Sequence, residues 1–494
     1  MYPCGGIDGG HVQGESLGVV GDRGCVADIE CDRAPGADAR SRVPCVEQPD
    51  RCHRMKARRR CRFAGRAVES RCLAGRGIDL VRIADADCHR RRDERDDRTR
   101  TTESHRWHTN VAPVRWDRLT FGIGLSYALL AWSMGYGAVL PELRDEVHMS
   151  ASLASLHGSL FGIFLLLLAT IGRRLLAGFS NRTLLVASVA GMFGGGLLFG
   201  LGRSAGLTLV GAGMAGAGAA CLVIVVPSVV FAHQPTAPTH AMAMLNTFPM
   251  LSATLLPVVV GVGLAGDVTW RAVYLVPLWL LAGGIALVAG ASAVPSTRHP
   301  EPIALGQLFR VPTFARRWAA LACGVLIEIG TGIWAASILV KQGGASKGVG
   351  ALLTVGFFVG MAVGRIGLAG VLRSHSAQRV FVASFVGVLI SLGPFLLGPG
   401  LVGRVIGLSL LGLSLSAVYP LSISRLFELH HDTEALGRAA AIASGIGVTF
   451  GPLLLGAFSD IVGLGPATIV LPVFGATGLM LTMTRPARDH ARAR

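Results

Sequence analysis

Apolar residues recur in long runs from about residue 119 to residue 483, and polar residues gather in the short segments between the runs. Each run has about 20 residues, the length of a helix that crosses a hydrocarbon core of about 30 Å. The alternating pattern of membrane β-barrel strands is absent from the runs. Because lipid offers backbone N–H and C=O groups no partner, the runs are predicted to be transmembrane helices. The twelve predicted helices span residues 119–140, 152–172, 183–201, 206–232, 241–264, 270–294, 318–340, 349–371, 379–397, 402–424, 437–459 and 464–483.

Two of the predicted helices end in similar sequences, IGRRLLAG at residues 171–178 and VGRIGLAG at residues 363–370, which start 192 residues apart. Helical prolines repeat at nearly the same offset. The matched pairs are Pro227 with Pro420 and Pro257 with Pro452, at 193 and 195 residues. A near-constant offset indicates that the first six helices are duplicated as the last six. The fold class predicted is therefore an all-α membrane protein, with twelve transmembrane helices in two six-helix pseudo-symmetric halves.

These halves are expected at residues 116–294 and 318–484, joined by a linker at 295–317 and followed by a tail at 485–494. Only 15% of the 494 residues are charged, against about 25% in soluble domains. Residues 1–115 differ, because they contain no apolar run long enough to span and hold eight of the ten cysteines. Their composition predicts a disordered extension, or an untranslated segment before a start at Met55 or near Val111. The cysteines lack the paired spacing of a zinc module.

Arginine is distributed unevenly between the two sets of connecting segments. The segments after even-numbered helices and the tail contain Arg173, Arg174, Arg182, Arg298, Arg310, Arg316, Arg317, Arg365, Arg373, Arg379, Arg425, Arg438 and the arginines of residues 485–494. The opposite side has mainly Arg144, Arg203, Arg271, Lys341 and Lys347. Positively charged loops face the cytoplasm, so both termini are predicted to be cytoplasmic in a multi-pass protein of the cell membrane. The net charge of +16 then says little about nucleic acid, and none is expected as a partner.

The sequence over residues 119–483 resembles the major facilitator superfamily. The residues that carry this resemblance are the two Gly-Arg-x-x-Leu-Ala-Gly helix ends, MLNTFPM at the fifth helix, Trp270 with Arg271, and the count of six plus six helices. EIGTGIW in the seventh helix and AVYPLSIS in the tenth are similar to the fucose-permease-like branch. The resemblance implies a secondary transporter with a substrate site between the halves, at mid-membrane.

Three departures from the patterns of relatives affect that expectation. The loop signature after the second helix usually contains an Asp that latches the cytoplasmic gate in relatives, and LLAGFSNRTLL has none. In fucose permease the proton-coupling carboxylates lie in helices 1 and 4, and those predicted helices contain no carboxylate here. Proton coupling and facilitated diffusion therefore both stay open. The Gly-Pro signature of drug antiporters is also missing before Pro257, which weakens multidrug export without excluding it.

Glu328 is the one carboxylate placed deep in a predicted helix, about halfway along the seventh. Ionisable residues inside a bilayer are costly and usually functional. We expect Glu328 to accept hydrogen bonds from substrate or to load and release a proton. The alternative is a structural role, with nearby hydroxyls or an arginine satisfying the carboxylate.

Polar and aromatic side chains inside the helices could line the same site, because sugar-type solutes are held by ring stacking and a few hydrogen bonds. The candidates are Tyr127, Trp132, Tyr136, Asn246, Trp334 and Tyr419. For each aromatic residue, packing or an interfacial position is the alternative. Asn246 is expected to need a partner, because an amide in lipid is costly. Arg173, Arg174 and Arg365 are expected at the cytoplasmic ends of two helices, where they either gate or orient the bundle.

Motifs for cofactors fail on context. GAGMAG at residues 211–216 fits a dinucleotide fingerprint, but it lies inside a transmembrane helix with no preceding strand. GGASKG near Lys347 lacks the P-loop spacing. We expect no cofactor, no metal and no enzyme activity, and a monomer. The energy for transport is expected to come from a gradient or from an associated protein.

The predicted function is secondary active transport of a small polar organic solute, sugar-like or an organic acid, by alternating access, with protons as a candidate coupling ion. The alternatives left open are a drug or metabolite exporter of the same superfamily and a non-transporting sensor or lipid scramblase.

Overall fold

The computed structural model describes residues 113–291, 294, 305–429 and 433–483. These residues form helices and no strands. Twelve helical segments in this part of the chain are long and apolar enough to cross a membrane, which confirms the predicted fold class. The extension expected at 1–115 and the tail at 485–494 lie almost entirely outside the described residues, as does the first part of the linker, residues 295–304.

The first six spans run from Arg118 to Ala289. They comprise α2 (Arg118–Ser133) with α3 (Tyr136–Val147), α4 (Ala151–Leu176), α5 (Asn181–Leu201), α6 (Ala205–His233), α7 (Pro238–Leu245) with α8 (Thr247–Ala265), and α9 (Trp270–Leu281) with α10 (Gly283–Ala289). We call this set the N-terminal half.

The last six spans form the C-terminal half, which a short helix, α11 (Leu305–Phe309), precedes. They comprise α12 (Pro312–Lys341), α13 (Lys347–Leu353) with α14 (Val355–Ser374), α15 (Ala377–Leu397), α16 (Gly400–Leu415) with α17 (Val418–Phe427), α18 (Thr433–Val462), and α19 (Leu464–Ala467) with α20 (Val470–Met483). α12 begins six residues before the predicted 318, because Pro312 occupies the first helical turn, where a missing N–H costs nothing.

Polar caps begin many of the helices. The side chain of Ser150, for example, accepts a hydrogen bond from the backbone N–H of Leu153 at the start of α4. Equivalent side-chain caps are Asp117, Ser180, Ser204, Thr269, Ser346 and Ser376. Each satisfies an N–H group that the helix cannot, at a gain of about 1 kcal/mol. The connections therefore fix where each apolar run enters the bundle.

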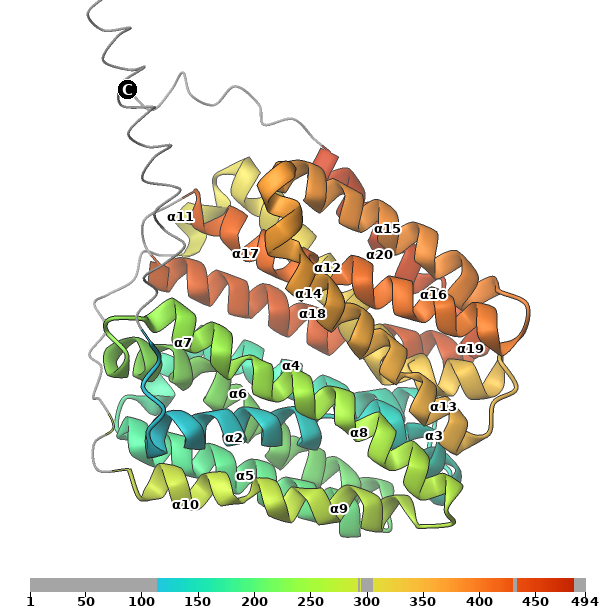
Figure 1. The fold of residues 1–494 in the computed structure, drawn as a ribbon. Helices are drawn as coiled ribbons and strands as arrows, with labels where there is room; N and C mark the ends of the chain where they lie inside the picture. The colour runs from blue at the N-terminus through green and yellow to red at the C-terminus, as the bar shows by residue number, and fades with distance from the viewer. Residues whose placement is uncertain (1–112, 292–293, 295–304, 430–432, 484–494) are drawn as a thin grey trace, which may run out of the picture. The chain divides into compact units, whose positions relative to one another are not determined.

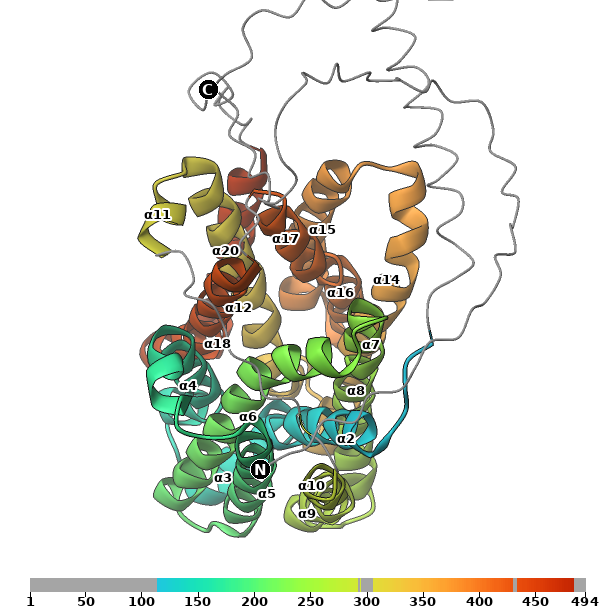
Figure 2. The same cartoon turned by 90° about the vertical axis from the view of Figure 1, so that its left-hand side faces the viewer.

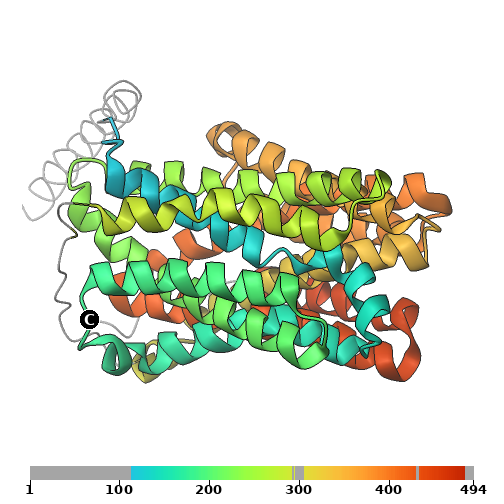
Figure 3. The same cartoon turned by 90° about the horizontal axis from the view of Figure 1, so that it is seen from below.

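The connections lie at two ends of the bundle. We call the end that contains residues 148–150, 202–204, 266–269, 342–346 and 398–399 the far end, and the opposite end, where the described chain begins and finishes, the termini-side end. In Figure 1 the far end lies at the right, around α13 and α19. Figure 3, from below, shows the helices of the N-terminal half lying side by side.

Two sets of packed helices lie at the edges of the boundary between the halves. α4 packs against α18, and α8 packs against α13 and α14. Figure 2, which looks at the termini-side end, shows the N-terminal half below and the C-terminal half above, with these pairs at the two edges of the boundary. α14 diverges from α8 toward its C-terminal end in Figures 1 and 2. The closest contact between these two helices therefore lies nearer the far end.

Candidate functional site

Glu328 and Arg365, both in the C-terminal half, form an ion pair. Nη2 of Arg365 on α14 lies 3.9 Å from Oε1 of Glu328 on α12. Nη1 of Arg365 donates a 2.8 Å hydrogen bond to the thioether sulfur of Met250 on α8. The pair is thus held where the two halves meet. Both side chains stay partly accessible, 33% for Arg365 and 21% for Glu328.

Two tyrosines from opposite halves lie beside this pair. Tyr419 of α17 interacts electrostatically with Glu328 and Arg365 and neighbours Ser444 of α18. Tyr127 of α2 lies within electrostatic range of Tyr419. Tyr127 is buried, whereas Tyr419 is 39% exposed. The structure therefore brings Glu328, Tyr127 and Tyr419 together with Arg365, four of the residues singled out from the sequence.

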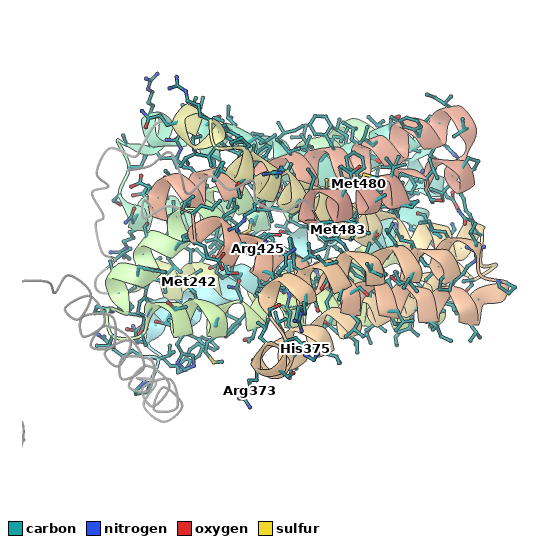
Figure 4. All side chains as sticks on the ribbon, turned by 90° about the horizontal axis from the view of Figure 1, so that it is seen from above. Met242, Arg373, His375, Arg425, Met480 and Met483 are labelled. Carbon is teal, nitrogen blue, oxygen red and sulfur yellow. The ribbon has the colours of Figure 1, made fainter. Side chains whose placement is uncertain are left out.

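The sequence predicted that Arg365 lies at the end of its helix, and the structure does not place it there. α14 continues for nine residues beyond it, to Ser374, which is about 13 Å of helix. Figure 4 shows Arg373 and His375 at that end of α14, pointing away from the bundle. The matching repeat misled the prediction, because α4 ends at Leu176, only three residues after Arg173. Arg365 therefore reaches the carboxylate of Glu328 instead of a loop.

Asn246 precedes Met250, the residue that contacts Arg365, by four residues along the chain. It is the residue between α7 and α8, it is exposed, and its side-chain amide donates a 2.9 Å hydrogen bond to the carbonyl oxygen of Met242. The expected need for a partner is met within its own helix. A contact of Asn246 with solute stays a prediction.

Trp132 and Tyr136 lie inside the N-terminal half, where other helices of the same half bury them. The indole N–H of Trp132 donates a 2.9 Å hydrogen bond to the carbonyl oxygen of Tyr274. The ring of Tyr136 packs on Phe199, with centroids 4.8 Å apart, and is 1% exposed. These contacts are those of the packing alternative, and a place for Trp132 and Tyr136 in a substrate site stays a prediction.

Trp334 joins the halves toward the far end. It is fully buried on α12, and its indole N–H lies 3.2 Å from Oγ of Ser155 on α4 and 3.3 Å from the carbonyl oxygen of Pro452 on α18. The guanidinium of Arg144 on α3 lies 5.5 Å from its ring centroid, within cation–π range. Trp334 therefore seals the contact between halves and does not line an open surface.

Asp460 of α18 ties the C-terminal half to the start of α4. Its carboxylate accepts hydrogen bonds from the backbone N–H groups of Ala151 at 2.7 Å and Ser152 at 2.8 Å, and from the hydroxyl of Ser152. Arg144 adds a favourable charge interaction. A carboxylate at a helix N-terminus satisfies free N–H groups and complements the helix dipole. This inter-half cap is specific to the far end.

Lys347 makes a second charged link at the far end. Its ammonium lies 2.6 Å from the carboxylate of Asp145 and 3.4 Å from that of Glu142, both on α3. Lys347 and Asp145 border a small cavity of about 130 Å³, lined also by Arg144 and Ser337. We call Asp460, Lys347 and their partners the far-end latch.

Backbone also meets backbone across the halves. A Cβ atom at Gly137 of α3 would lie 2.2 Å from the carbonyl oxygen of Gly332 on α12. A Cβ atom at Gly162 of α4 would lie 2.5 Å from the backbone nitrogen of Thr449 on α18. Neither position tolerates a side chain, so glycine is required for this approach.

The arginines at the end of α4 are less informative. The side chain of Arg173 is not among those described, and Arg174 is exposed in the last turn of α4. At the start of α5, Arg182 donates a hydrogen bond to the carbonyl oxygen of Ala289 on α10. The gating role expected for Arg173 and Arg174 stays a prediction.

Sequence reasoning missed the far-end latch and a buried histidine. His157 of α4 is fully buried, and its Nε2 lies 3.0 Å from the hydroxyl of Thr208 on α6. Its signal is a lone polar ring in the apolar run ASLHGSLFG. The latch had no such signal, because Ala151 and Asp460 lie 309 residues apart. Within the described residues, no three His, Cys, Asp or Glu side chains lie close enough to hold a metal ion.

Trp270 and Arg271, which carried part of the family resemblance, form a clamp within the N-terminal half. The carboxylate of Glu146 accepts hydrogen bonds from the indole of Trp270 at 3.0 Å and the guanidinium of Arg271 at 2.8 Å. Arg271 also donates a 2.7 Å hydrogen bond to the carbonyl oxygen of Gly200. This clamp joins α3, α5 and α9 at the far end.

Comparison with known proteins agrees with this architecture. Residues 121–442 match the family model of the Major Facilitator Superfamily. A mutant form of the nucleoside transporter NupG superposes with a TM-score of 0.61 at 10% identity, covering 74% of this chain and 98% of NupG. No curated protein matches the sequence.

A second solved fold gives the same result. A bacterial homologue of the human lysosomal transporter Spinster superposes in two structures. Its unoccupied form gives a TM-score of 0.60 at 14% identity, covering 76% of this chain and all of the homologue, and its occupied form gives 0.58 at 14%, covering 74% and 95%. These identities support a shared fold alone.

Proposed function

Because this chain belongs to the major facilitator superfamily, we propose that it is a secondary transporter that carries a small polar organic solute between its two halves, beside Glu328 and Arg365. The observation that carries the proposal is this accessible ion pair, with Met250 and Tyr127 of one half and Tyr419 of the other around it. Groups from both halves around one point are what alternating access needs, because rocking then exposes the same site to each side.

The closed far end supports a state in which the site opens toward the termini-side end. The far-end latch, Trp334 and the contact at Gly137 hold the halves together there. α14 diverges from α8 toward the other end. Glu328 and Arg365 are then reached from the termini-side end, which gives the accessibility that they show.

The termini-side end is the cytoplasmic one in this proposal, and the membrane is the cell membrane. Described arginines gather in the segments at that end, among them Arg174, Arg182, Arg310, Arg316, Arg317, Arg373, Arg379, Arg425 and Arg438. Arginine-rich loops are retained on the cytoplasmic side. A reporter fused after Arg494 should be active in the cytoplasm, and one near Lys347 should report the outside. Reversed reporters would contradict this orientation.

The solute binds by hydrogen bonds and ring contact in this proposal. Tyr127 and Tyr419 contribute rings and hydroxyls, and Glu328 contributes an acceptor. The hydroxyl groups of Thr331 and Thr449, which are buried without a partner among the described residues, add hydrogen-bonding capacity on α12 and α18. Such a mixture of apolar walls and a few polar groups is typical of small-molecule sites.

Flux in liposomes tests the proposal. The purified full-length protein should give saturable, substrate-competed uptake of at least one radiolabelled solute from a panel of sugars, organic acids, nucleosides and drugs, chosen by thermal-shift screening. Glu328→Gln should alter that uptake, and Asp267→Asn, at an exposed loop carboxylate, is the matched control. Lipid movement without solute flux, or no flux from any class, would overturn the proposal.

A further inference from the structure

Among the described residues, the guanidinium of Arg365 has no oxygen acceptor within hydrogen-bond distance. Its one hydrogen bond in this part of the chain goes to the sulfur of Met250, and the carboxylate oxygen of Glu328 stands at 3.9 Å. A thioether is a weak acceptor, whereas a guanidinium has five N–H donors and is always charged. Ionic hydrogen bonds are usually about 2.7 to 2.9 Å long. Most of the donors of Arg365 are therefore free of described partners, and one third of the side chain is accessible.

Structural arginines of the same chain are satisfied differently. Arg271 donates to the carboxylate of Glu146 at 2.8 Å and to the carbonyl of Gly200 at 2.7 Å. Arg404 donates to the carbonyl oxygens of Phe395 at 3.1 Å and Leu396 at 2.7 Å, at the end of α15. Both guanidinium groups fasten helices together through oxygen. Arg365 stands apart from them, so a purely structural role does not account for its free donors.

We propose that Arg365 binds the carboxylate of the transported solute, which makes the substrate a small organic monoanion. This proposal rests on the function proposed above. A guanidinium offers a planar two-donor fork that matches a carboxylate. The carboxylate of Glu328 lies 3.9 Å from the guanidinium of Arg365, which is longer than a hydrogen bond. A solute carboxylate can therefore bind Arg365 at a shorter distance than Glu328 does.

The charges at the site favour one carboxylate over a phosphate or a neutral sugar. Among the described residues, the groups that act on Glu328 are Arg365 of α14 and Tyr419 of α17, so the site holds one positive and one negative charge. When a solute carboxylate binds Arg365, the charge of Glu328 is no longer balanced by the guanidinium. Uptake of one proton by Glu328 restores neutrality, and a doubly charged phosphate would need more. A neutral solute can accept hydrogen bonds from the arginine but gains no charge–charge attraction.

The binding step is balanced in charge and protons. The pair of Arg365 cation and Glu328 carboxylate, plus a solute carboxylate and one proton, gives the pair of Arg365 cation and solute carboxylate, plus neutral Glu328. No bond other than the O–H bond on Glu328 forms. The solute and the proton thus enter the site together, and release of both to the other side restores the starting pair.

Pairs of an organic acid and a neutral analogue test the proposal in the full-length protein. The probes are lactate with lactamide, benzoate with benzamide, and gluconate with glucose, each measured by thermal shift and by competition in liposome flux. At least one acid should bind, with its neutral partner at least about tenfold weaker, because a charge-assisted bidentate contact is lost. Arg365→Lys keeps the charge without the fork and should weaken that acid about tenfold, and Arg365→Met should abolish its binding.

The outcomes separate the two proposals. Saturable flux of neutral solutes that acids do not inhibit, or unchanged acid affinity in Arg365→Lys, overturns the carboxylate assignment and leaves transport standing. Absence of flux for every solute overturns the proposed function itself. If Arg365→Met does not fold, the acid and amide comparison in the wild type and in Arg365→Lys still decides.

Discussion

The carboxylate of Asp460 accepts a 2.7 Å hydrogen bond from the backbone N–H of Ala151, so a residue of the C-terminal half caps a helix of the N-terminal half. Helix caps ordinarily come from the residue just before the helix, and α4 has such a cap in Ser150. The second cap breaks whenever the far end opens. It therefore stabilises one conformation over the other and leaves α4 itself intact.

Removing this cap should open the far end more often. Asp460→Ala loses two backbone hydrogen bonds and the charge at the helix terminus, about 1 to 2 kcal/mol. The ratio of open to closed protein should rise about fivefold to thirtyfold. The measurement is the rate at which Ser337→Cys, beside the far-end cavity, reacts with a membrane-impermeant thiol reagent. Asp267→Asn in the same background should leave the rate unchanged, and equal rates in Asp460→Ala would refute the latch.

Reversing the charge of Lys347 should have a similar effect through repulsion. Lys347→Asp places a carboxylate against Asp145 and Glu142, so the Ser337→Cys labelling rate should rise severalfold. Adding Asp145→Lys should restore much of the original rate, because the ion pair is rebuilt with its partners exchanged. The increase should shrink at 1 M salt, where charges are screened beyond about 3 Å. A double variant no slower than the single one contradicts a direct pair.

Glu328→Gln separates charge from packing at the central pair. The amide keeps the shape and can face Arg365, but it cannot take up a proton. The variant should still exchange solute across the membrane and should lose accumulation driven by a pH gradient. Uptake in liposomes with and without an imposed gradient measures both. Gradient-driven uptake equal to that of the wild type removes Glu328 from the coupling.

Asp117 should make stability depend on acid pH. Burial raises the pKa of Asp117, but hydrogen bonds from the backbone N–H of Thr120 and from the ring of His233 outweigh it, so the pKa lies below the usual value of 3.8. The folded state therefore favours the carboxylate. This stabilisation is complete well above the unfolded pKa and disappears as the pH falls through the folded one.

Melting temperatures between pH 7 and pH 3 measure this effect. Asp117→Asn should lower the Tm at pH 7 by an amount that corresponds to about 1 kcal/mol or less, since the group is partly exposed. The gap from the wild type should close as the pH approaches 3. A gap of constant size down to pH 3 would show that the charge of Asp117 contributes nothing.

Substitutions at Trp132 and Tyr419 should have different effects, the first on stability and the second on solute affinity. Trp132→Phe removes the hydrogen bond to Tyr274, so the Tm should fall, at a cost of about 1 kcal/mol, with solute affinity unchanged. Tyr419→Phe removes a partly exposed hydroxyl beside Glu328, so affinity should fall severalfold with little change in Tm. Thermal shift with and without solute gives both quantities. An affinity loss confined to Trp132→Phe would reverse the two assignments.

The sequence was sufficient for the twelve spans, because apolar length follows from the thickness of the bilayer. It also singled out Glu328, since a lone carboxylate in an apolar helix is visible without coordinates. The depth of Arg365 could not be read in the same way. The repeat aligns it with Arg173, but α14 continues nine residues beyond its arginine and α4 only three. Helix length after the motif, set by the following polar residues, decided its place.

The aromatic residues show a second limit. Trp132 and Tyr127 lie five residues apart on α2, which places them on different faces, so one packs within its half and the other approaches Tyr419. Composition cannot tell which face points to the partner half. The far-end latch was hidden for another reason, because each of its charges lies near a helix end, where charged residues are common.

Gly137 also determines how the halves can stop moving. Its Cα faces the carbonyl of Gly332 with no room for a methyl group. In the proposed rocking motion, closing of the far end therefore stops at a contact between two backbones, which cannot yield as flexible side chains do. The closed conformation in this proposal is thus limited by a rigid backbone contact. A single added methyl group, as in Gly137→Ala, would keep the two backbones from reaching this contact. The substitution is therefore a minimal tool for trapping the opposite state.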